Sequence, residues 1–264
     1  IGLAIGRFFL NTEDLHYGYW PKGKTATIQN FVEAQGAHSK LIMDHIPDGT
    51  ERILDVGSGS GSLALKLINK GFQVDCVIPS EFLAEQVQAK LGDRSTIHIC
   101  GFESVADSEK YDLILFSESF QYVKLGKSLE KITNMLNPGG YLLICDFFKR
   151  DGLGKSPMGG GHSWQLFRDK IDAYPLCLIS DQDITEETAP TIDLMAKFNT
   201  DVVTPLAEMS GEYLIDHYPQ LSKLFRWKFR KRLDKIHNIY LSGAVNGDSF
   251  KQFKKYHLLV YERR

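Results

Sequence analysis

Short apolar runs alternate with amphipathic segments along much of this chain. The apolar runs are brief and rich in β-branched residues, which favours buried strands. The amphipathic segments repeat an apolar residue every three or four positions, which favours helices. We expect strands over residues 53–56, 72–78, 96–100, 110–117, 141–146, 176–184 and 256–261, and helices over 28–46, 62–70, 80–91, 125–136 and 164–173. This alternation predicts an α/β fold with a doubly wound, mostly parallel sheet.

A glycine-rich turn follows the first predicted strand. Its glycines stand at alternate positions: Gly57, Gly59 and Gly61. Glycine permits a sharp turn and a close approach of a ligand to the backbone. The helix that begins at Ser62 offers free N–H groups and a positive dipole end to a carboxylate or phosphate. Asp55, two residues before the first glycine, suits a ligand that carries an amino group. The turn therefore predicts a nucleotide-type cofactor site.

Composition and charge narrow the class of protein. The chain has 264 residues, with 31 Lys and Arg against 33 Asp and Glu, so no overall field attracts nucleic acid. No apolar run is long enough to span a membrane, and no signal-peptide pattern is present. The four cysteines lie in apolar runs without metal-ligand spacing, which is typical of reduced thiols. We therefore expect a cytoplasmic protein with no metal site and no nucleic-acid partner.

Three motifs resemble those of class I S-adenosylmethionine (SAM) methyltransferases. The pattern Asp55-x-Gly57-x-Gly59-x-Gly61 resembles the first motif of that family, and Leu136-x-Pro138-Gly139-Gly140 resembles the turn before its fifth strand. The segment His16-Tyr17-Gly18-Tyr19-Trp20 resembles one found in methyltransferases of the tocopherol and cyclopropane fatty-acid synthase type. The glycine spacing differs from the dinucleotide pattern, so a nicotinamide oxidoreductase fits badly.

The resemblance implies a single Rossmann-like domain with a seven-stranded sheet in the order 3-2-1-4-5-7-6. Its expected parts are an N-terminal lid (1–44), a core (45–185 and 253–264) and a helical cap (186–252). The implied function is methyl transfer from SAM to an O, N or C atom of a small molecule by direct displacement. A SAM-binding scaffold, or a cyclase that kept the fold, is the alternative. The sequence leaves a homodimer open.

The resemblance also implies which residues contact the cofactor. They are Tyr17, Tyr19, Asp55, Gly57, Gly59, Gly61, Ile78, Pro79, Phe102, Glu103 and Ser117. Two positions depart from the family pattern. Ile78 stands where the family has the acid that holds the ribose hydroxyls, and Gly101 stands where it has the aspartate that bonds adenine. Asp75, three residues before Ile78, is a poor substitute for the first of these acids.

The catalytic candidates are His162, His16 and Glu118, in that order. His162 lies on a glycine-rich loop and carries an imidazole that titrates near neutral pH, although it also fits an ordinary surface histidine. Glu118 ends the fourth predicted strand and fits either a site contact or a helix cap. The expected substrate contacts are Trp20, Tyr122, Phe147 and Trp164.

An amphipathic helix is predicted over residues 224–240. Its apolar face carries Phe225, Phe229, Leu233, Ile236 and Tyr240, and its other face carries Lys223, Arg226, Arg230, Lys231 and Lys235. A solvated face is one interpretation of the basic side. The other is a surface that contacts an acidic substrate, a carrier protein or a membrane.

Overall fold

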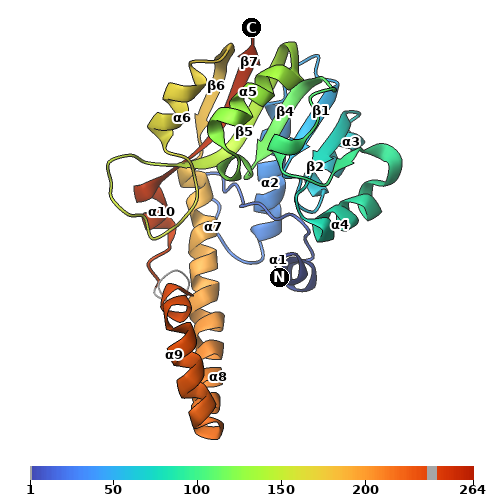
Figure 1. Ribbon diagram of the computed structural model, residues 1–264. Coiled ribbons are helices and arrows are strands. Elements are labelled where there is room, and N and C mark those ends of the chain that lie inside the picture. The colour runs from blue at the N-terminus through green and yellow to red at the C-terminus, as the bar shows by residue number, and fades with distance from the viewer. Residues whose placement is uncertain (1, 237–242) are drawn as a thin grey trace.

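The computed structural model describes residues 2–236 and 243–264, which form one seven-stranded sheet with helices on both faces (Figure 1). The strands are β1 (Arg52–Val56), β2 (Gln73–Val77), β3 (Ile97–His98), β4 (Tyr111–Ser117), β5 (Leu136–Lys149), β6 (Leu176–Asp183) and β7 (Lys254–Arg263). Their order, β3-β2-β1-β4-β5-β7-β6, confirms the predicted topology. All neighbouring pairs are parallel except those of β7, which runs antiparallel to β5 and β6.

The helices of the core follow the predicted periodicity with shifted ends. They are α2 (Phe31–Asp44), α3 (Ser62–Asn69), α4 (Glu81–Leu91), α5 (Leu125–Met135), α6 (Trp164–Ile171) and α10 (Gly247–Phe253). The side chain of Ser80 accepts a hydrogen bond from Leu83 N and so caps α4. Within the described ranges, no helix is long and apolar enough to cross a bilayer.

Two strands differ from their predicted lengths. The third strand forms only over Ile97–His98, since it pairs with β2 alone at the edge of the sheet. The fifth runs from Leu136 to Lys149, because β7 pairs with it past residue 146 as far as Lys149. The lengths of both strands therefore depend on pairing with strands that are distant in the sequence, and a local pattern cannot predict such pairing.

The sheet buries an apolar cluster on each face. One cluster includes Ile53 and Leu113 and packs against α3 and α4 through residues such as Leu67 and Val87. The other includes Leu54 and packs against α5 and α6. Because both faces are covered, the central strands are almost wholly buried, as parallel sheets require.

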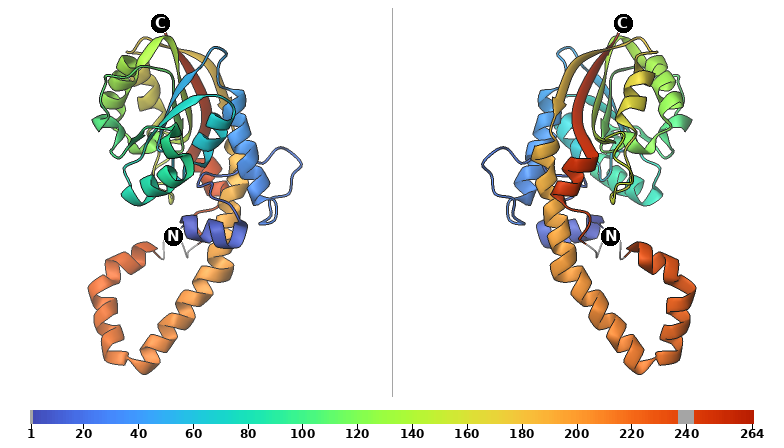
Figure 2. Two further views of the ribbon diagram at one scale, coloured as in Figure 1. Left: turned by 90° about the vertical axis from the view of Figure 1, so that its right-hand side faces the viewer. Right: turned by 90° about the vertical axis from the view of Figure 1, so that its left-hand side faces the viewer.

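Two segments extend beyond this core. The chain begins with α1 (Gly2–Ile5) and the π-helical η1 (Gly6–Leu10) and then runs without helix or strand to α2. After β6, α7 (Thr185–Phe198), η5 (Asn199–Val203) and α8 (Thr204–His217) form a long helical rod, from which α9 (Pro219–Ile236) turns back. Figures 1 and 2 show this rod and α9 projecting far from the sheet. The predicted helix over 224–240 is helical to Ile236, and its remainder, including Tyr240, lies outside the described residues.

Candidate active site

A cleft of about 460 Å³ lies at the carboxyl ends of β1, β4 and β5. The glycine turn after β1 forms its floor, and residues 14–17 of the lid form its roof. The loop after β5 closes one side with Met158, Gly159 and Gly160. Ligands of open α/β sheets bind at this edge, where the order of the strands reverses.

An unpaired carboxylate oxygen lies at the cleft, in β1 just before the glycine turn. Gly57 has a φ of +80°, and a Cβ there would overlap the Cβ of Ser119, so the turn requires glycine. Asp55 is 1% exposed, and its Oδ2 has no hydrogen-bond partner among the described residues. Burial raises the pKa of its carboxyl to about 7. The hydroxyl of Ser117, at the end of β4, is likewise buried without a partner. Both residues line the cleft, and buried polar atoms of this kind usually have a hydrogen-bond partner.

Glu118 stands in the cleft next to Ser117. It has a φ of +54°, which is unusual outside glycine. Its Oε1 accepts hydrogen bonds from the N–H of Tyr17 (2.7 Å) and the hydroxyl of Tyr256 (2.9 Å). Burial raises the pKa of Glu118 to about 8, although the bond from Tyr17 opposes this. A carboxyl held in this way exchanges a proton near neutral pH.

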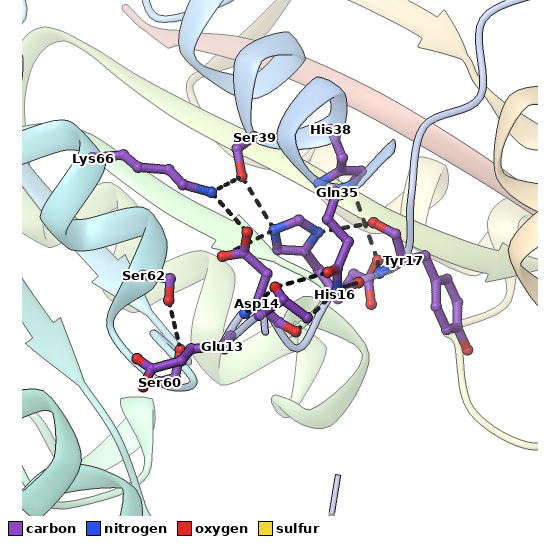
Figure 3. Close-up of polar contacts among 12 residues, drawn as sticks. Glu13, Asp14, His16, Tyr17, Gln35, His38, Ser39, Ser60, Ser62 and Lys66 are labelled. Atoms are coloured by element: carbon purple, nitrogen blue, oxygen red, sulfur yellow. Dashed lines mark hydrogen bonds and ion pairs between the residues drawn. The ribbon is translucent and has the colours of Figure 1, made fainter. Parts of the chain in front are cut away.

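A polar network fastens the lid to the helices below it (Figure 3). Lys66 of α3 donates to Asp14 Oδ2 (2.8 Å) and to Ser39 Oγ of α2 (2.9 Å). The side-chain amide of Gln35 donates to the carbonyls of Asp14 and His16. The imidazole of His16 lies 2.8 Å from the carbonyl of its neighbour, Tyr17, and 3.2 Å from Ser39 Oγ. Both of its ring nitrogens therefore already have partners.

The lid also touches the glycine turn itself. Ser60 Oγ donates to the carbonyl of Glu13 (2.5 Å), and Leu15 lies over Gly59. The cleft between lid and sheet is walled by Tyr17, Tyr122 and Phe147. Aromatic faces attract cations, and a covered cleft keeps water from a reacting centre.

Comparison with known proteins identifies the family of this site. The profile of a family described as "Methyltransferase domain" matches residues 28–186, which hold the glycine turn, Asp55 and Glu118. The chain belongs to this methyltransferase family. The match covers more than half of the chain and ends where α7 begins.

Curated relatives match this methyltransferase over part of its length. An uncharacterized methyltransferase of Mycobacterium tuberculosis is 26% identical over 97 residues, which are 37% of this chain and 40% of that protein. The malonyl-[acyl-carrier protein] O-methyltransferase 2 of Ilyobacter polytropus is 29% identical over 102 residues, 37% of this chain and 39% of the relative. The match thus spans about two fifths of each relative's length.

Solved structures share the fold over nearly the whole chain. Geranyl diphosphate C-methyltransferase from Streptomyces coelicolor, in complex with S-adenosyl-L-homocysteine, has a TM-score of 0.69 at 15% identity, covering 100% of this chain and 92% of that one. The cyclase SpnF has a TM-score of 0.68 at 17% identity, covering 95% and 87%. At these identities the likeness concerns the fold alone.

The methyltransferase cleft brings together about half of the predicted site residues. Those that line it are His16, Tyr17, Asp55, Gly57, Gly59, Ser117, Glu118, Tyr122 and Phe147. Gly61 lies next to the cleft as the N-cap of α3, with a φ of +76°. Their roles toward a ligand stay predictions.

The other predicted residues lie away from the cleft walls. Ile78 is buried after β2, beside an exposed Pro79. Phe102 packs edge-on against Phe116 in the core, and Glu103 accepts a hydrogen bond from Lys124 N. Asp75, considered as a substitute for the ribose acid, is instead paired with Arg52.

The same holds for the predicted residues of the lid and the loop after β5. Tyr19 N–H donates to the carbonyl of Ala34. The indole of Trp20 is buried and donates to Thr191. His162 has Nε2 3.0 Å from the carbonyl of Phe120, and its ring lies edge-on to that side chain. Trp164 stacks on His257 at the far side of β5, with ring centroids 4.3 Å apart.

The structure adds residues that sequence reasoning missed. His38 of α2 lies 3.0 Å from the hydroxyl of Tyr256 on β7, which in turn donates to Glu118. Asp14 and Lys66 pair across the lid. The signal for His38 was its place on the inward face of an amphipathic helix, where a buried polar residue needs a partner. No local signal marked Tyr256, which reads as an ordinary strand residue.

Proposed function

We propose that this chain transfers the methyl group of S-adenosylmethionine to an O, N or C atom of a small-molecule acceptor. The observation that carries the proposal is the pair of unpartnered buried oxygens, Asp55 Oδ2 and Ser117 Oγ, beside a turn that only glycine permits. An amino group is the partner that a carboxylate at this place needs, and free backbone N–H groups at a helix start suit a carboxylate. Both groups belong to the amino-acid end of SAM, so these residues fit that end.

Different residues of the cleft have different roles in the proposed reaction. Asp55 and the turn hold the amino-acid end of the cofactor, which supplies an electrophilic methyl group when bound. The lid, fastened by Lys66, excludes water and aligns the acceptor. Where the acceptor's nucleophile carries a proton, Glu118 receives it, because its carboxyl lines the cleft and has a pKa raised to about 8.

Calorimetric titration tests the cofactor assignment. We expect SAM and S-adenosylhomocysteine to bind the wild type, and Asp55→Asn to bind both about 10- to 100-fold more weakly, because a charge-assisted hydrogen bond is lost. Asp112→Asn is the matched control, since Asp112 lies at the opposite end of β4 and caps the start of β1. A wild type that gives no heat at saturating SAM would refute the proposal.

A SAM-binding scaffold or a cyclase is the second candidate. It is favoured by Ile78, which leaves the end of β2 without an acid, and by the fold that this chain shares with the cyclase SpnF. Incubation with methyl-labelled SAM and a panel of small phenols, amines, carboxylic acids and prenyl diphosphates separates the two. A mass gain of one methyl group on any acceptor supports transfer. Tight SAM binding without such a gain supports the scaffold or cyclase.

A further inference from the structure

The helices α8 and α9 form a hairpin, residues 204–236, that stands away from the body of the molecule (Figures 1 and 2). Among the described residues, no hydrogen bond or ion pair joins side chains 205–233 to the sheet or its covering helices. No residue of α8 is buried. The hairpin therefore contributes surface to the molecule rather than core.

This surface is unusually apolar. On α8, Leu206, Met209 and Tyr213 are 59%, 66% and 56% exposed, and on α9, Trp227 is 77% exposed. A groove of about 800 Å³ also lies between the two helices, lined by Leu214, Ile215, Leu221 and Phe225 among others. Exposed apolar surface on this scale marks an interaction site in a folded protein.

Positive charge is concentrated on one helix of the hairpin, α9. The helix α9 holds seven of the chain's 31 basic residues but only one of its 33 acids, although the whole chain has a net charge of −2. Basic residues alternate with Phe225, Trp227 and Phe229 along it. The acids Glu208 and Glu212 of α8 line the groove between the helices, as does Arg226 of α9, whereas Lys223, Arg230 and Lys231 do not. They therefore do not neutralise the outer side of α9.

We propose that the α8–α9 hairpin docks on an anionic lipid bilayer. A helix that interleaves Lys and Arg with exposed aromatic residues binds the plane of such a surface, because its cations meet lipid phosphates while its aromatic side chains enter the headgroup boundary. Neither described helix of the hairpin is long and apolar enough to cross a bilayer, so docking on the surface is the arrangement we propose. A protein partner would need acidic groups matched to each cation, whereas an anionic bilayer supplies negative charge everywhere.

The position of the hairpin relative to the cleft is consistent with docking on a bilayer. The hairpin leaves the sheet at the end where the parallel strands have their carboxyl ends, opposite the C-terminus of the chain (Figure 1). The cleft lies at that same end. Docking by the hairpin therefore turns this end of the molecule toward the lipid. The inference does not depend on methyl transfer, because a protein that binds no SAM would still present this surface.

Vesicle flotation of the full chain tests the inference. We expect binding to vesicles of equal parts phosphatidylglycerol and phosphatidylcholine, and little binding to phosphatidylcholine alone. The triple variant Lys223→Gln, Arg230→Gln, Lys231→Gln should bind about 100-fold more weakly, since each cation near such a surface contributes about a fivefold factor. The matched control replaces three exposed lysines of the body: Lys22→Gln, Lys70→Gln and Lys127→Gln. It should bind as the wild type does.

Tryptophan fluorescence gives a second readout. Trp227 is exposed, so its emission should shift to shorter wavelength on the anionic vesicles, and Trp227→Ala should abolish that shift. Equal binding to both kinds of vesicle, or a triple variant that binds like the control, would overturn the proposal. So would a stable dimer in light scattering without lipid that Trp227→Ala dissociates, because a second copy would then cover the hairpin. Circular dichroism of each variant checks that it is folded.

Discussion

Glu118 combines an unusual backbone conformation, a buried carboxyl group and a position in the cleft. Its positive φ turns it out of the line of β4. Its Oε1 is bound by Tyr17 and Tyr256, while Oε2 has no hydrogen bond among the described residues. The imidazole of His16 is occupied on both nitrogens, and His162 faces Phe120. Of the three predicted catalytic residues, Glu118 is therefore the one with a free atom at the cleft.

Glu118→Gln tests its role as a proton acceptor. For an acceptor whose nucleophile carries a proton, we expect turnover to fall by about 100-fold or more, because general-base catalysis is lost. In the wild type, turnover should rise with pH and reach half of its maximum near pH 8, where the raised pKa of Glu118 lies. The variant should lack this rise in its pH–rate profile. Glu103→Gln, outside the cleft, should keep it, and a rise that persists in Glu118→Gln would remove Glu118 from the mechanism.

At the scale of elements, the glycine turn and the lid make the cleft between them. The turn needs glycine at Gly57 for two independent reasons, the positive φ and the contact with Ser119. The lid lies on the turn through Ser60 and Leu15. A change in either element should alter cofactor binding.

Gly57→Val should abolish SAM binding. A branched side chain at a φ of +80° is strained and would overlap Ser119, so the turn must move away from the position that holds the ligand. Calorimetry measures the loss. Gly71→Val is the control, because Gly71 also has a positive φ but nothing lies within 4 Å of its added Cβ. It should lower the melting temperature through backbone strain and leave SAM affinity unchanged.

Lys66→Met should loosen the lid. The change leaves the carboxylate of Asp14, which is 11% exposed, without its cation. We expect faster amide hydrogen exchange over residues 12–17 and a weaker affinity for SAM. Lys70→Met, at the end of the same helix but outside the network, serves as the control. Unchanged exchange at Tyr17 in Lys66→Met would mean that the lid is held by its other contacts.

At the scale of the whole molecule, buried ionisable groups make stability depend on pH. Burial raises the pKa values of Asp55, Glu118 and Asp146 to about 7, 8 and 7. The folded chain thus keeps protons that the unfolded chain releases, and stability falls as pH rises from about 4 to about 8. Burial lowers the pKa values of His16 and His38. Below about pH 6.5 these histidines are therefore protonated in the unfolded chain while they stay neutral in the folded chain. Stability consequently also falls as pH drops below about 6.5.

Thermal unfolding across this range checks the account. We expect the melting temperature to fall as pH rises from about 6.5 to about 8.5, because over this range the histidines are neutral in both states and only the three carboxyls change charge. Glu118→Gln keeps the shape of the side chain but cannot ionise. It should therefore match the wild type near pH 4.5 and exceed it near pH 8.5. If the melting temperatures of the variant and the wild type change with pH by the same amount, the pKa of Glu118 is not raised in the folded protein.

Much of the architecture followed from local patterns. The run from Arg52 to Ser62 predicted a strand, a glycine turn and a helix, because each depends on its own residues' periodicity or φ preference. The prediction also located Asp55, Gly57 and Glu118 in one site, since the carboxyl ends of parallel strands share an edge. His162 and Trp164 illustrate the limit. They also follow the end of a strand. However, His162 packs against Phe120 and Trp164 stacks on His257, so neither side chain lines the cleft.

By itself, the sequence determined the strand order through its family motifs, and the place of the sharp turn after β1 through glycine geometry. Only the tertiary structure decided what surrounds that turn. Glu118 meets Tyr17 and Tyr256 across 101 and 138 positions of chain, and Lys66 reaches Asp14 across 52. It also decided that the apolar faces of α8 and α9 stay uncovered, since burial depends on what packs against a helix and not on the helix alone.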